Sequence, residues 1–566
     1  MYLRLCTAGL GLLLLSSPSN AQVDGILQIN NPLQLFLERQ QTRGLLNGAI
    51  LSHQPLSAYE ANGYLDSLAA NSDALQRMSA VDRRLLARFR GEAPGPGVEY
   101  VRRRLPGLYK NGQDFFSTEG DDYGIQVTPV LYLDAARVLQ NTEEAPSTAG
   151  ESADAIISWR NTRGIRAAGH LGDHLFFETR VEENQRVVPV ADRALVNQRV
   201  GQRYFRDGRM FDYWVVTGVA GVRTKYVEIR AGRDRNLWSA GRGALLVSNF
   251  PTTYDQVQLR TRVWRLQYTN VFASLSDPSI PRDSVTSAIR DKYGVFHRLA
   301  IDLPGRVQIG LSEASILAPT AEDQGPGFYM AFFNPIIFLR AVDFEEGSPA
   351  NMLIALDAQW VATSGVQVYG QFMLDEFRAA ELFGGRGWIN NKWGALAGVH
   401  IASVGVQDLE LRAEYARVRP YTYSSVDTQR ALVHHLGIVG HPYGPNAESV
   451  AFWANYRPSD RITASIFATA ARRGRNDGDV NWGGDPLVPY TLNFPREFGV
   501  TLGQGIRQTE VRLEGRFGFE LLPNLIVEAT AGYTRIGDAG NPALVRNYIS
   551  FGGGLRWSLP YSNPRF

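Results

Sequence analysis

A set of charged, amide and aromatic residues lies at the ends of predicted strands and in the long loops between them. Carboxylates, amides and guanidinium groups exchange hydrogen bonds with sugar hydroxyls, and aromatic rings stack on sugar faces. We therefore predict a polysaccharide-binding surface. The alternative is that these side chains cross-link folded loops into a plug. The candidate residues are Arg233, Asp234, Trp238, Glu313, Asn334, Asp375, Glu376, Trp388, His441, Tyr443 and Asn446.

Catalytic chemistry has less support in the sequence. A carboxylate pair such as Glu313 and Asp375 would suit glycoside hydrolysis, which requires two carboxyl groups at a defined separation, but the sequence encodes no distance between them. The serines and histidines lack the Gly-x-Ser-x-Gly element of an esterase. We assign no catalytic residue and expect a protein that is not an enzyme.

Two loop stretches resemble ligand sites but lack essential parts. Residues 232–243 are rich in glycine and arginine, yet they lack the lysine and the following helical pattern of a phosphate-binding loop. His434, His435 and His441 lack the H-E-x-x-H spacing of a zinc site, and the prolines of residues 441–446 predict a rigid turn. The sequence therefore predicts neither a metal nor a cofactor.

The first residues have the pattern of a secretory leader. Arg4, the apolar run of residues 10–15 and the small residues Ser19 and Ala21 predict a signal peptide over residues 1–21. The single cysteine, Cys6, lies within it, so we expect no disulfide after cleavage. The formal charge of +2 provides no basic field directed at nucleic acid, which we exclude as a partner.

Residues 22–118 differ in pattern from the rest of the chain. Apolar residues recur at helical spacing after Pro32, Ser57 and Ser79, and Ser57 with Glu60 forms a capping-box pattern. Val98 begins what we predict to be a last helical turn after the Pro- and Gly-rich break of residues 93–97. We predict three or four short helices in a small periplasmic region.

Apolar and charged residues alternate along most segments after Tyr123. In residues 510–519 the odd positions, such as Val511 and Phe517, are apolar, whereas Glu510 and Arg512 fall on the other face. No later stretch approaches the roughly 20 consecutive apolar residues of a membrane-spanning helix. We predict an all-β transmembrane barrel of about 18 antiparallel strands over residues 119–566, rather than a soluble propeller or β-helix, because no fixed repeat period is present. The predicted strands are 123–133, 155–168, 171–184, 211–222, 225–234, 255–264, 265–275, 294–302, 305–317, 351–361, 364–376, 392–402, 406–418, 447–456, 460–471, 506–519, 523–536 and 546–558.

Short and long connections alternate between these strands. Turns such as 303–305 and 522–524 are short, whereas 185–210, 419–446 and 472–505 are long. Outer-membrane barrels have short periplasmic turns and long extracellular loops. We therefore predict an outer-membrane protein whose N-terminal region and C-terminus are periplasmic. The terminal Phe566 matches an outer-membrane assembly signal, although Pro560 and Pro564 interrupt the last strand.

The chain resembles the Wzi family of capsule-assembly outer-membrane proteins. The resemblance rests on residues 232–249, 296–299 with 310–313, 333–335, 374–377 and 440–446, and more weakly on 28–32 and 52–57. It implies an eighteen-stranded, blocked barrel with a periplasmic helical bundle, acting as a lectin that attaches exported capsular polysaccharide to the cell surface. The implied partners are capsular or exported polysaccharide, outer-membrane lipid and the polysaccharide export machinery.

Two other functions remain open at this point. A porin or sugar-transport channel would conduct ions through its charged lumen, whereas a plugged lectin would be nearly silent in planar bilayers. An outer-membrane enzyme acting on glycan or lipid would lose turnover when Glu313 or Asp375 is replaced by the corresponding amide.

Overall fold

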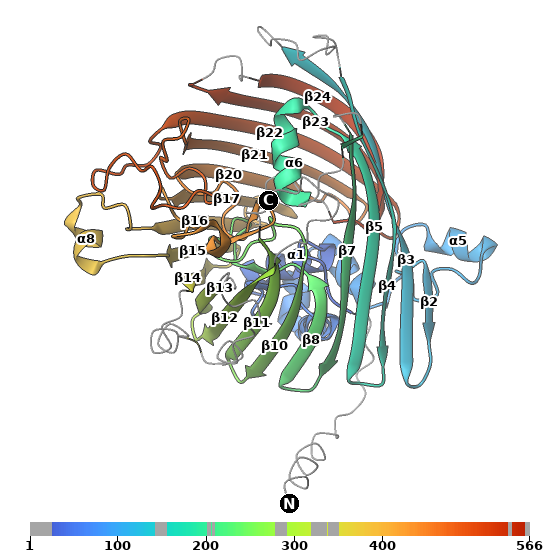
Figure 1. The fold of residues 1–566 in the computed structure, drawn as a ribbon. Coiled ribbons are helices and arrows are strands. Elements are labelled where there is room, and N and C mark those ends of the chain that lie inside the picture. Colours follow the sequence, from blue (N-terminus) through green and yellow to red (C-terminus); the bar gives the residue numbers. More distant parts are fainter. Residues whose placement is uncertain are drawn as a thin grey trace, which may run out of the picture.

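Eighteen strands close into one antiparallel barrel in the part of the chain that the structure, a computed structural model, describes (Figure 1). β24 pairs with β3 and completes the ring, from Asn547 opposite Asn141 to Trp557 opposite Leu131. The predicted fold class is confirmed. The predicted leader, Asn334 and Phe566 lie outside the described residues. The described residues are 25–141, 156–200, 205–206, 210–277, 291–317, 337, 350–540 and 546–560.

Each predicted strand corresponds in order to one strand of the barrel, although the predicted ends differ by up to eight residues from those of the structure. Four residues of β2 (Phe116–Glu119) extend the sheet by pairing with β3. The short β6 (Phe205–Arg206) pairs with β7. The barrel strands are β3 (Tyr123–Asn141), β4 (Ile156–Leu171), β5 (Leu175–Val187), β7 (Met210–Arg223), β8 (Val227–Asp234), β10 (Tyr254–Val263), β11 (Leu266–Ser276), β12 (Asp291–Leu303), β13 (Val307–Leu317), β14 (Asn351–Thr363), β15 (Val366–Leu374), β16 (Trp393–Ala402), β17 (Leu409–Val418), β20 (Ala447–Tyr456), β21 (Ile462–Arg475), β22 (Ile506–Leu522), β23 (Leu525–Asp538) and β24 (Arg546–Trp557).

The alternation along the strands separates an apolar outside from a charged inside. On β22, Leu513 and Phe517 are 49% and 50% exposed, whereas Glu510 and Arg512 are buried. Outward apolar side chains without a protein partner suit contact with acyl chains, and the enclosed polar face suits a lumen. On β22 the two-residue alternation of the sequence therefore predicts the correct face for these side chains.

Connection length defines two ends of the barrel. The turns after β4, β7, β10, β12, β14, β16, β20 and β22 are short, and we call their side the short-turn end. Two of these turns place Asn524 and Gly365 at positive φ, a conformation that asparagine and glycine adopt most readily. The connections after β5, β8, β15, β17 and β21 are long and lie at the opposite side, the long-loop end (Figure 1).

The predicted helices form where their capping residues indicated. The Ser57 side chain accepts a hydrogen bond from the Glu60 amide and completes the capping box of α2. Asn31 caps α1, whose first residue is Pro32. Among the described helices, none combines the length and the apolar character needed to cross a membrane. The helices are α1 (Pro32–Thr42), α2 (Ala58–Ala70), α3 (Ser72–Arg77), α4 (Ala80–Phe89), α5 (Val98–Arg104), α6 (Val190–Val200), α8 (Ala379–Gly384) and the 3₁₀ turn η2 (Thr428–Arg430).

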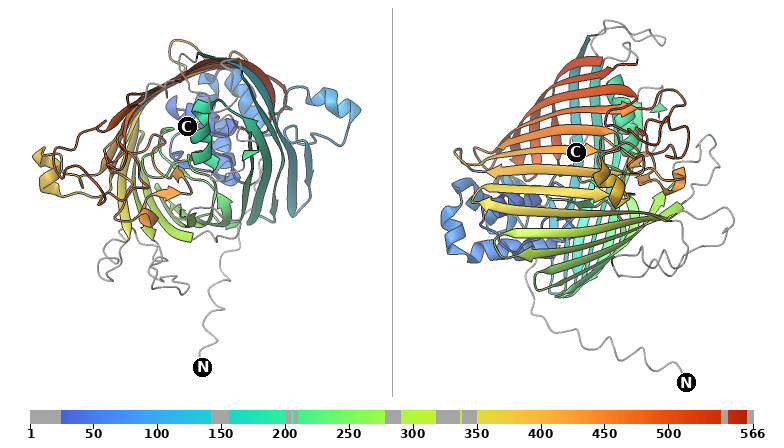
Figure 2. Two further views of the ribbon diagram at one scale, coloured as in Figure 1. Left: turned by 45° about the horizontal axis from the view of Figure 1, so that its top comes forward. Right: turned by 90° about the vertical axis from the view of Figure 1, so that its left-hand side faces the viewer.

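The first helices fill the lumen near the short-turn end. The left view of Figure 2 shows them inside the ring of strands. Leucine and phenylalanine side chains of α1, α2 and α4 form a common apolar core. Arginine–carboxylate pairs join this core to the wall: Glu38 contacts Arg412 at 3.1 Å, and Arg88 contacts Glu520 at 2.8 Å. Arginine suits such pairs in a confined space, because its guanidinium group can bind a carboxylate through two parallel hydrogen bonds.

Two long connections fill the lumen from the other end. Residues 237–247 and 423–439 contribute Trp238, Leu245, Tyr423 and Leu432 to a second apolar core, which packs on inward side chains of β11 to β17. This core meets the N-terminal region where β1 (His53–Gln54) pairs with β9 (Leu237–Trp238). The lumen beside β10 to β17 is therefore packed with protein.

Candidate functional site

Two adjacent candidates at the end of β8 point in opposite directions. Arg233 lies on the outer face, where its guanidinium contacts Asp255 at 2.6 Å, and both side chains are about half exposed. Asp234 faces the lumen and lines a cavity there. Alternation along the strand separates the two residues, so they cannot contact one ligand together.

Trp238 and Glu313 lie deep inside the barrel. Trp238 is fully buried, with its ring edge against Phe296 and its backbone paired with His53. Glu313 contacts the His297 ring at 3.2 Å on neighbouring strands. Asp375, the other carboxylate of the hydrolysis alternative, belongs to a separate cluster described below. The structure thus places the two carboxylates in different surroundings.

The connection after β17 carries His441, Tyr443 and Asn446, and all three are buried. The Tyr443 hydroxyl donates to Glu510 at 3.1 Å, and the His441 amide donates to the Tyr423 hydroxyl at 3.1 Å. The Asn446 amide donates to the carbonyls of Gly474 and Gln504, each at 2.9 Å, and accepts from the Gly503 amide at 2.7 Å. The Asn446 side chain therefore cross-links the loops, the Tyr443 side chain fixes the connection to β22, and His441 is held through its backbone amide.

Asp375 and Glu376 follow β15 and anchor the same connection. Lys392 lies 3.2 Å from Glu376 and 3.8 Å from Asp375, and the Tyr423 amide donates to Asp375 at 2.8 Å. Burial raises the pKa of Asp375 to about 6, although Lys392 opposes the shift. Lys392 also lies 4.0 Å from the Tyr490 ring centroid. The cluster joins three connections at the long-loop end.

Trp388 lies nearer the surface of the long-loop end. Its indole nitrogen donates to Glu497 at 3.2 Å, and the Arg378 guanidinium lies 4.6 Å from its ring centroid. It packs with Tyr421 and Val500 and is 7% exposed. Its neighbours Arg378 and Glu497 are exposed.

An exposed aromatic segment in the connection after β21 was missed by the sequence analysis. Every residue from 491 to 499 is exposed. Phe494 is 40% exposed, and Phe498 is 39% exposed with the Arg386 guanidinium 4.8 Å from its ring centroid. Two phenylalanines and an arginine within five residues, next to Pro495, were the available signal. We call residues 491–499 the rim segment.

The two ligand-like loop stretches bind parts of the protein itself. The backbone amides of Arg242 and Gly243 donate to the Glu414 carboxylate at 2.7 and 3.1 Å, so this glycine-rich loop holds an internal anion. His434 accepts from the Ser276 amide and contacts the Thr253 carbonyl, and burial holds its pKa well below the ordinary value. No group of three or more metal-binding side chains is present among the described residues.

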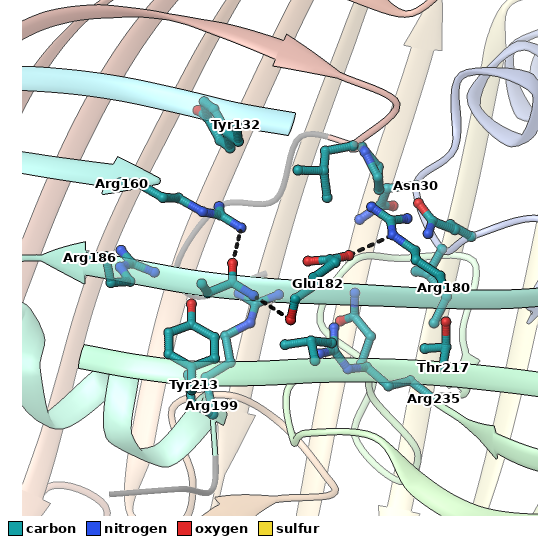
Figure 3. A pocket seen from close by; sticks show the side chains of 18 of the residues that line it. Asn30, Tyr132, Arg160, Arg180, Glu182, Arg186, Arg199, Tyr213, Thr217 and Arg235 are labelled. Atoms are coloured by element: carbon teal, nitrogen blue, oxygen red, sulfur yellow. Dashed lines mark hydrogen bonds and ion pairs between the residues drawn. The ribbon is translucent and has the colours of Figure 1, made fainter. Parts of the chain in front are cut away.

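A region of open space also lies inside the barrel, beside the packed half of the lumen. A cavity of about 340 Å³ lies between β4, β5, β7, α6 and the extended residues 26–30 (Figure 3). Arginines and carboxylates from these elements line it. Of the predicted site residues within the described chain, it includes only Asp234.

Comparisons with known proteins agree with this architecture. The family model for the capsule assembly protein Wzi matches residues 215–538. The solved structure of Wzi from Escherichia coli, described as a carbohydrate-binding β-barrel involved in group 1 capsule assembly, has a TM-score of 0.55 and 13% identity over 95% of this chain and 100% of its own.

Other structures are less similar. The outer membrane protein OprD from Pseudomonas aeruginosa gives a TM-score of 0.41 at 11% identity, covering 78% of this chain and 96% of its own. OpdK from the same organism, solved with vanillate, gives 0.41 at 10% identity, covering 76% and 98%. No curated protein sequence matches at a significant level.

Proposed function

We propose that this chain, which belongs to the family of the capsule assembly protein Wzi, binds capsular or exported polysaccharide and anchors it at the surface of the outer membrane. The family match over residues 215–538 carries the proposal, because this range contains the long connections described above. The E. coli Wzi barrel, which shares the fold, is described as carbohydrate-binding. We propose binding without chemical turnover.

The orientation that we propose places the long-loop end outside the cell. Short turns of outer-membrane barrels face the periplasm and long loops face outward. The N-terminal helices within the predicted region 22–118 lie near the short-turn end and would contact the periplasm and the export machinery. Polysaccharide outside the cell would then meet the long connections.

Within that end, we place the main contact at the rim segment. A polymer needs an accessible surface, and Phe494 and Phe498 are exposed, whereas Trp238, His441, Tyr443 and Asn446 are buried. Exposed phenylalanine rings beside Arg386 offer stacking faces and a hydrogen-bond donor. The predicted residues nearest to this surface are Glu376, which is 35% exposed at its side chain, and Trp388.

The packed lumen favours a binder over the channel alternative. The two apolar cores and the arginine–carboxylate pairs occupy the half of the lumen beside β10 to β17. We expect refolded wild-type protein to give almost no single-channel conductance in planar bilayers. A steady open-channel current would instead support the porin alternative.

The anchoring proposal is tested in a strain that lacks the protein. We expect the deletion to release capsule into the medium and the wild-type gene to restore retention. The double substitution Phe494→Ala and Phe498→Ala should reduce both retention and binding of purified capsule to the purified barrel. Trp264→Ala is the matched control, because Trp264 is an exposed aromatic residue in a short turn at the opposite end. Full capsule retention in the deletion strain would refute the proposal.

A further inference from the structure

The lumenal cavity has an uneven distribution of charge. Its carboxylates are engaged by neighbouring groups: Glu182 contacts Arg180 at 2.6 Å, and Glu178 contacts Arg166 at 3.1 Å and accepts from the Ile26 amide at 2.7 Å. These groups lie toward residues 26–30. The opposite part of the cavity, below α6, contains Arg160, Arg186 and Arg235, none of which forms an ion pair among the described residues. Two carboxylates that also line the cavity act on them at longer range, Asp134 on Arg160 and Arg186, and Asp234 on Arg235.

Arg160 and Arg186 lie directly opposite each other on β4 and β5 and face the lumen. Like charges at opposed positions of neighbouring strands destabilise a sheet. Arg160 donates to Thr162 at 2.9 Å and to Asn184 at 3.3 Å, and it lies 4.7 Å from the Tyr132 ring centroid. All three partners are neutral. Among the described residues, neither arginine forms an ion pair.

Two further arginines come from other elements to the same place. Arg199 extends from α6 and Arg235 from the connection after β8, and Figure 3 shows both with Arg186 and Tyr213 around the cavity. The Arg235 Nε group is buried without a hydrogen-bond acceptor among the described residues. Burial, together with Arg235, Arg186 and Arg160, lowers the pKa of Arg199 to about 9. The guanidinium groups of Arg160, Arg186 and Arg235 thus converge beside Arg199, and Asp134 offsets part of their repulsion. A bound anion would relieve more of it.

We propose that this cavity binds a carboxylate-bearing saccharide residue, with the carboxylate between Arg160, Arg186 and Arg235. Guanidinium groups bind carboxylates through paired, charge-assisted hydrogen bonds. The cavity volume of about 340 Å³ lies within the range of small-ligand pockets, roughly 300–1,000 Å³. Tyr132 and Tyr213 supply aromatic faces and hydroxyls for the sugar ring. This site deepens the proposed function, on which it rests, by adding an internal position for an acidic sugar.

In the proposed orientation, a saccharide would reach this position from the short-turn, periplasmic end during export. Two further cavities, of about 210 and 160 Å³, share lining residues with the first, including Asn30 with one and Leu27 with the other. The smaller one extends to Asp460 and Asn524 in the short turns. At the other end α6 covers the arginines, held across the lumen by Asp192, which contacts Arg512 at 2.7 Å and Tyr548 at 2.6 Å.

The site can be tested by calorimetric titration of the full chain in detergent at low salt. The ligands are D-glucuronate, its uncharged counterpart D-glucose, and inorganic phosphate as an alternative anion. Wild-type protein should bind glucuronate and not glucose. The double variant Arg186→Gln/Arg235→Gln should bind glucuronate at least about tenfold more weakly, because each lost hydrogen bond to a charged group contributes roughly 1.5–3 kcal/mol. Arg163→Gln is the matched control, since Arg163 lies on the same strand as Arg160 but on the outer face. It should bind as the wild type does.

The titrations can support or overturn the proposed saccharide site. Equal glucuronate affinity in the wild type and the double variant, or no binding by the wild type, would overturn it. Binding of phosphate without glucuronate would assign the arginines to a phosphate group and overturn the saccharide ligand. If the double variant fails to fold, the single variant Arg235→Gln replaces it, because Arg235 lies in a connection and not in a strand. Wild-type protein that retains capsule but does not bind glucuronate would refute this site alone.

Discussion

Two connections at the same end of the barrel use polar and aromatic residues in opposite ways. The connection between β17 and β20 turns inward, and its Tyr423, His441, Tyr443 and Asn446 are all buried. The rim segment of the next long connection is exposed throughout. Residue types that suit sugar binding therefore identify a binding surface only where the backbone leaves them accessible. In the inward connection the same groups hold the structure together.

The largest expected effect concerns Asn446, which joins three segments of the loops. Asn446→Gly preserves the positive φ of this residue but removes hydrogen bonds to two buried carbonyls and one amide. Each such group left unpaired costs roughly 1–3 kcal/mol, so the total loss is on the order of 3 kcal/mol or more. We expect a clear decrease in the urea midpoint of the purified barrel in lipid.

The matched substitution lies in the rim segment. Asn493 also has positive φ but is exposed, and Asn493→Gly should change the free energy of unfolding by less than about 0.5 kcal/mol. Equal losses at the two asparagines would contradict the distinction between a structural connection and an accessible one.

The next effect is a pH dependence at the anchor of the inward connection. Burial raises the pKa of Asp375 to about 6 from 3.8, so the folded protein holds this proton at higher pH than the unfolded chain does. Its stabilising contribution is therefore fully present below about pH 3.8 and is lost as the pH rises through 6, by at most about 3 kcal/mol. We expect the melting temperature to decline over this window.

Asp375→Asn removes the titrating group and should flatten that part of the profile. Thermal denaturation followed by circular dichroism from pH 4 to 7 compares the two proteins. An unchanged slope in the variant would show that another group titrates.

A smaller effect is expected at Tyr443, another buried member of the inward connection. Tyr443→Phe removes the hydroxyl that donates to Glu510 but leaves the ring packed with Ala447 and Phe467. Glu510 retains Arg512 at 2.7 Å, so the expected loss is about 1–1.5 kcal/mol. Urea denaturation measures it, and polysaccharide affinity should remain within about twofold of the wild type. A tenfold loss of affinity with unchanged stability would instead make Tyr443 a ligand contact.

The barrel could be predicted from the sequence because strand alternation, turn residues and helix caps each depend only on residues that are close together in the chain. Alternation decides which side chains of β22 face outward, and prolines, glycines and asparagines mark short turns such as Pro523-Asn524. The capping box at Ser57 likewise needs only four residues. These features depend on the chain within a few positions and are visible without tertiary contacts.

The site depends on contacts between distant residues, which local patterns do not contain. Trp238 is buried because residues 237–247 enter the lumen and meet His53, far away in the chain. Arg160, Arg186 and Arg235 converge only after barrel closure and the folding of one loop. Phe494 differs from the buried aromatics by its surroundings and not by its type.

The smallest stability effect is expected in the rim segment, where the effect on binding should be largest. Phe494→Ser removes an exposed ring that is not part of any buried apolar cluster among the described residues, so the free energy of unfolding should change by less than about 0.5 kcal/mol. Loss of one stacking face should weaken capsule binding severalfold, since aromatic contacts contribute about 0.5–1.5 kcal/mol. Binding of labelled capsule to immobilised barrel measures this, with urea denaturation in parallel. Because Tyr443→Phe should give the reverse pattern, the pair separates the accessible surface from the structural connection, and a Phe494→Ser variant that binds normally would move the contact away from the rim segment.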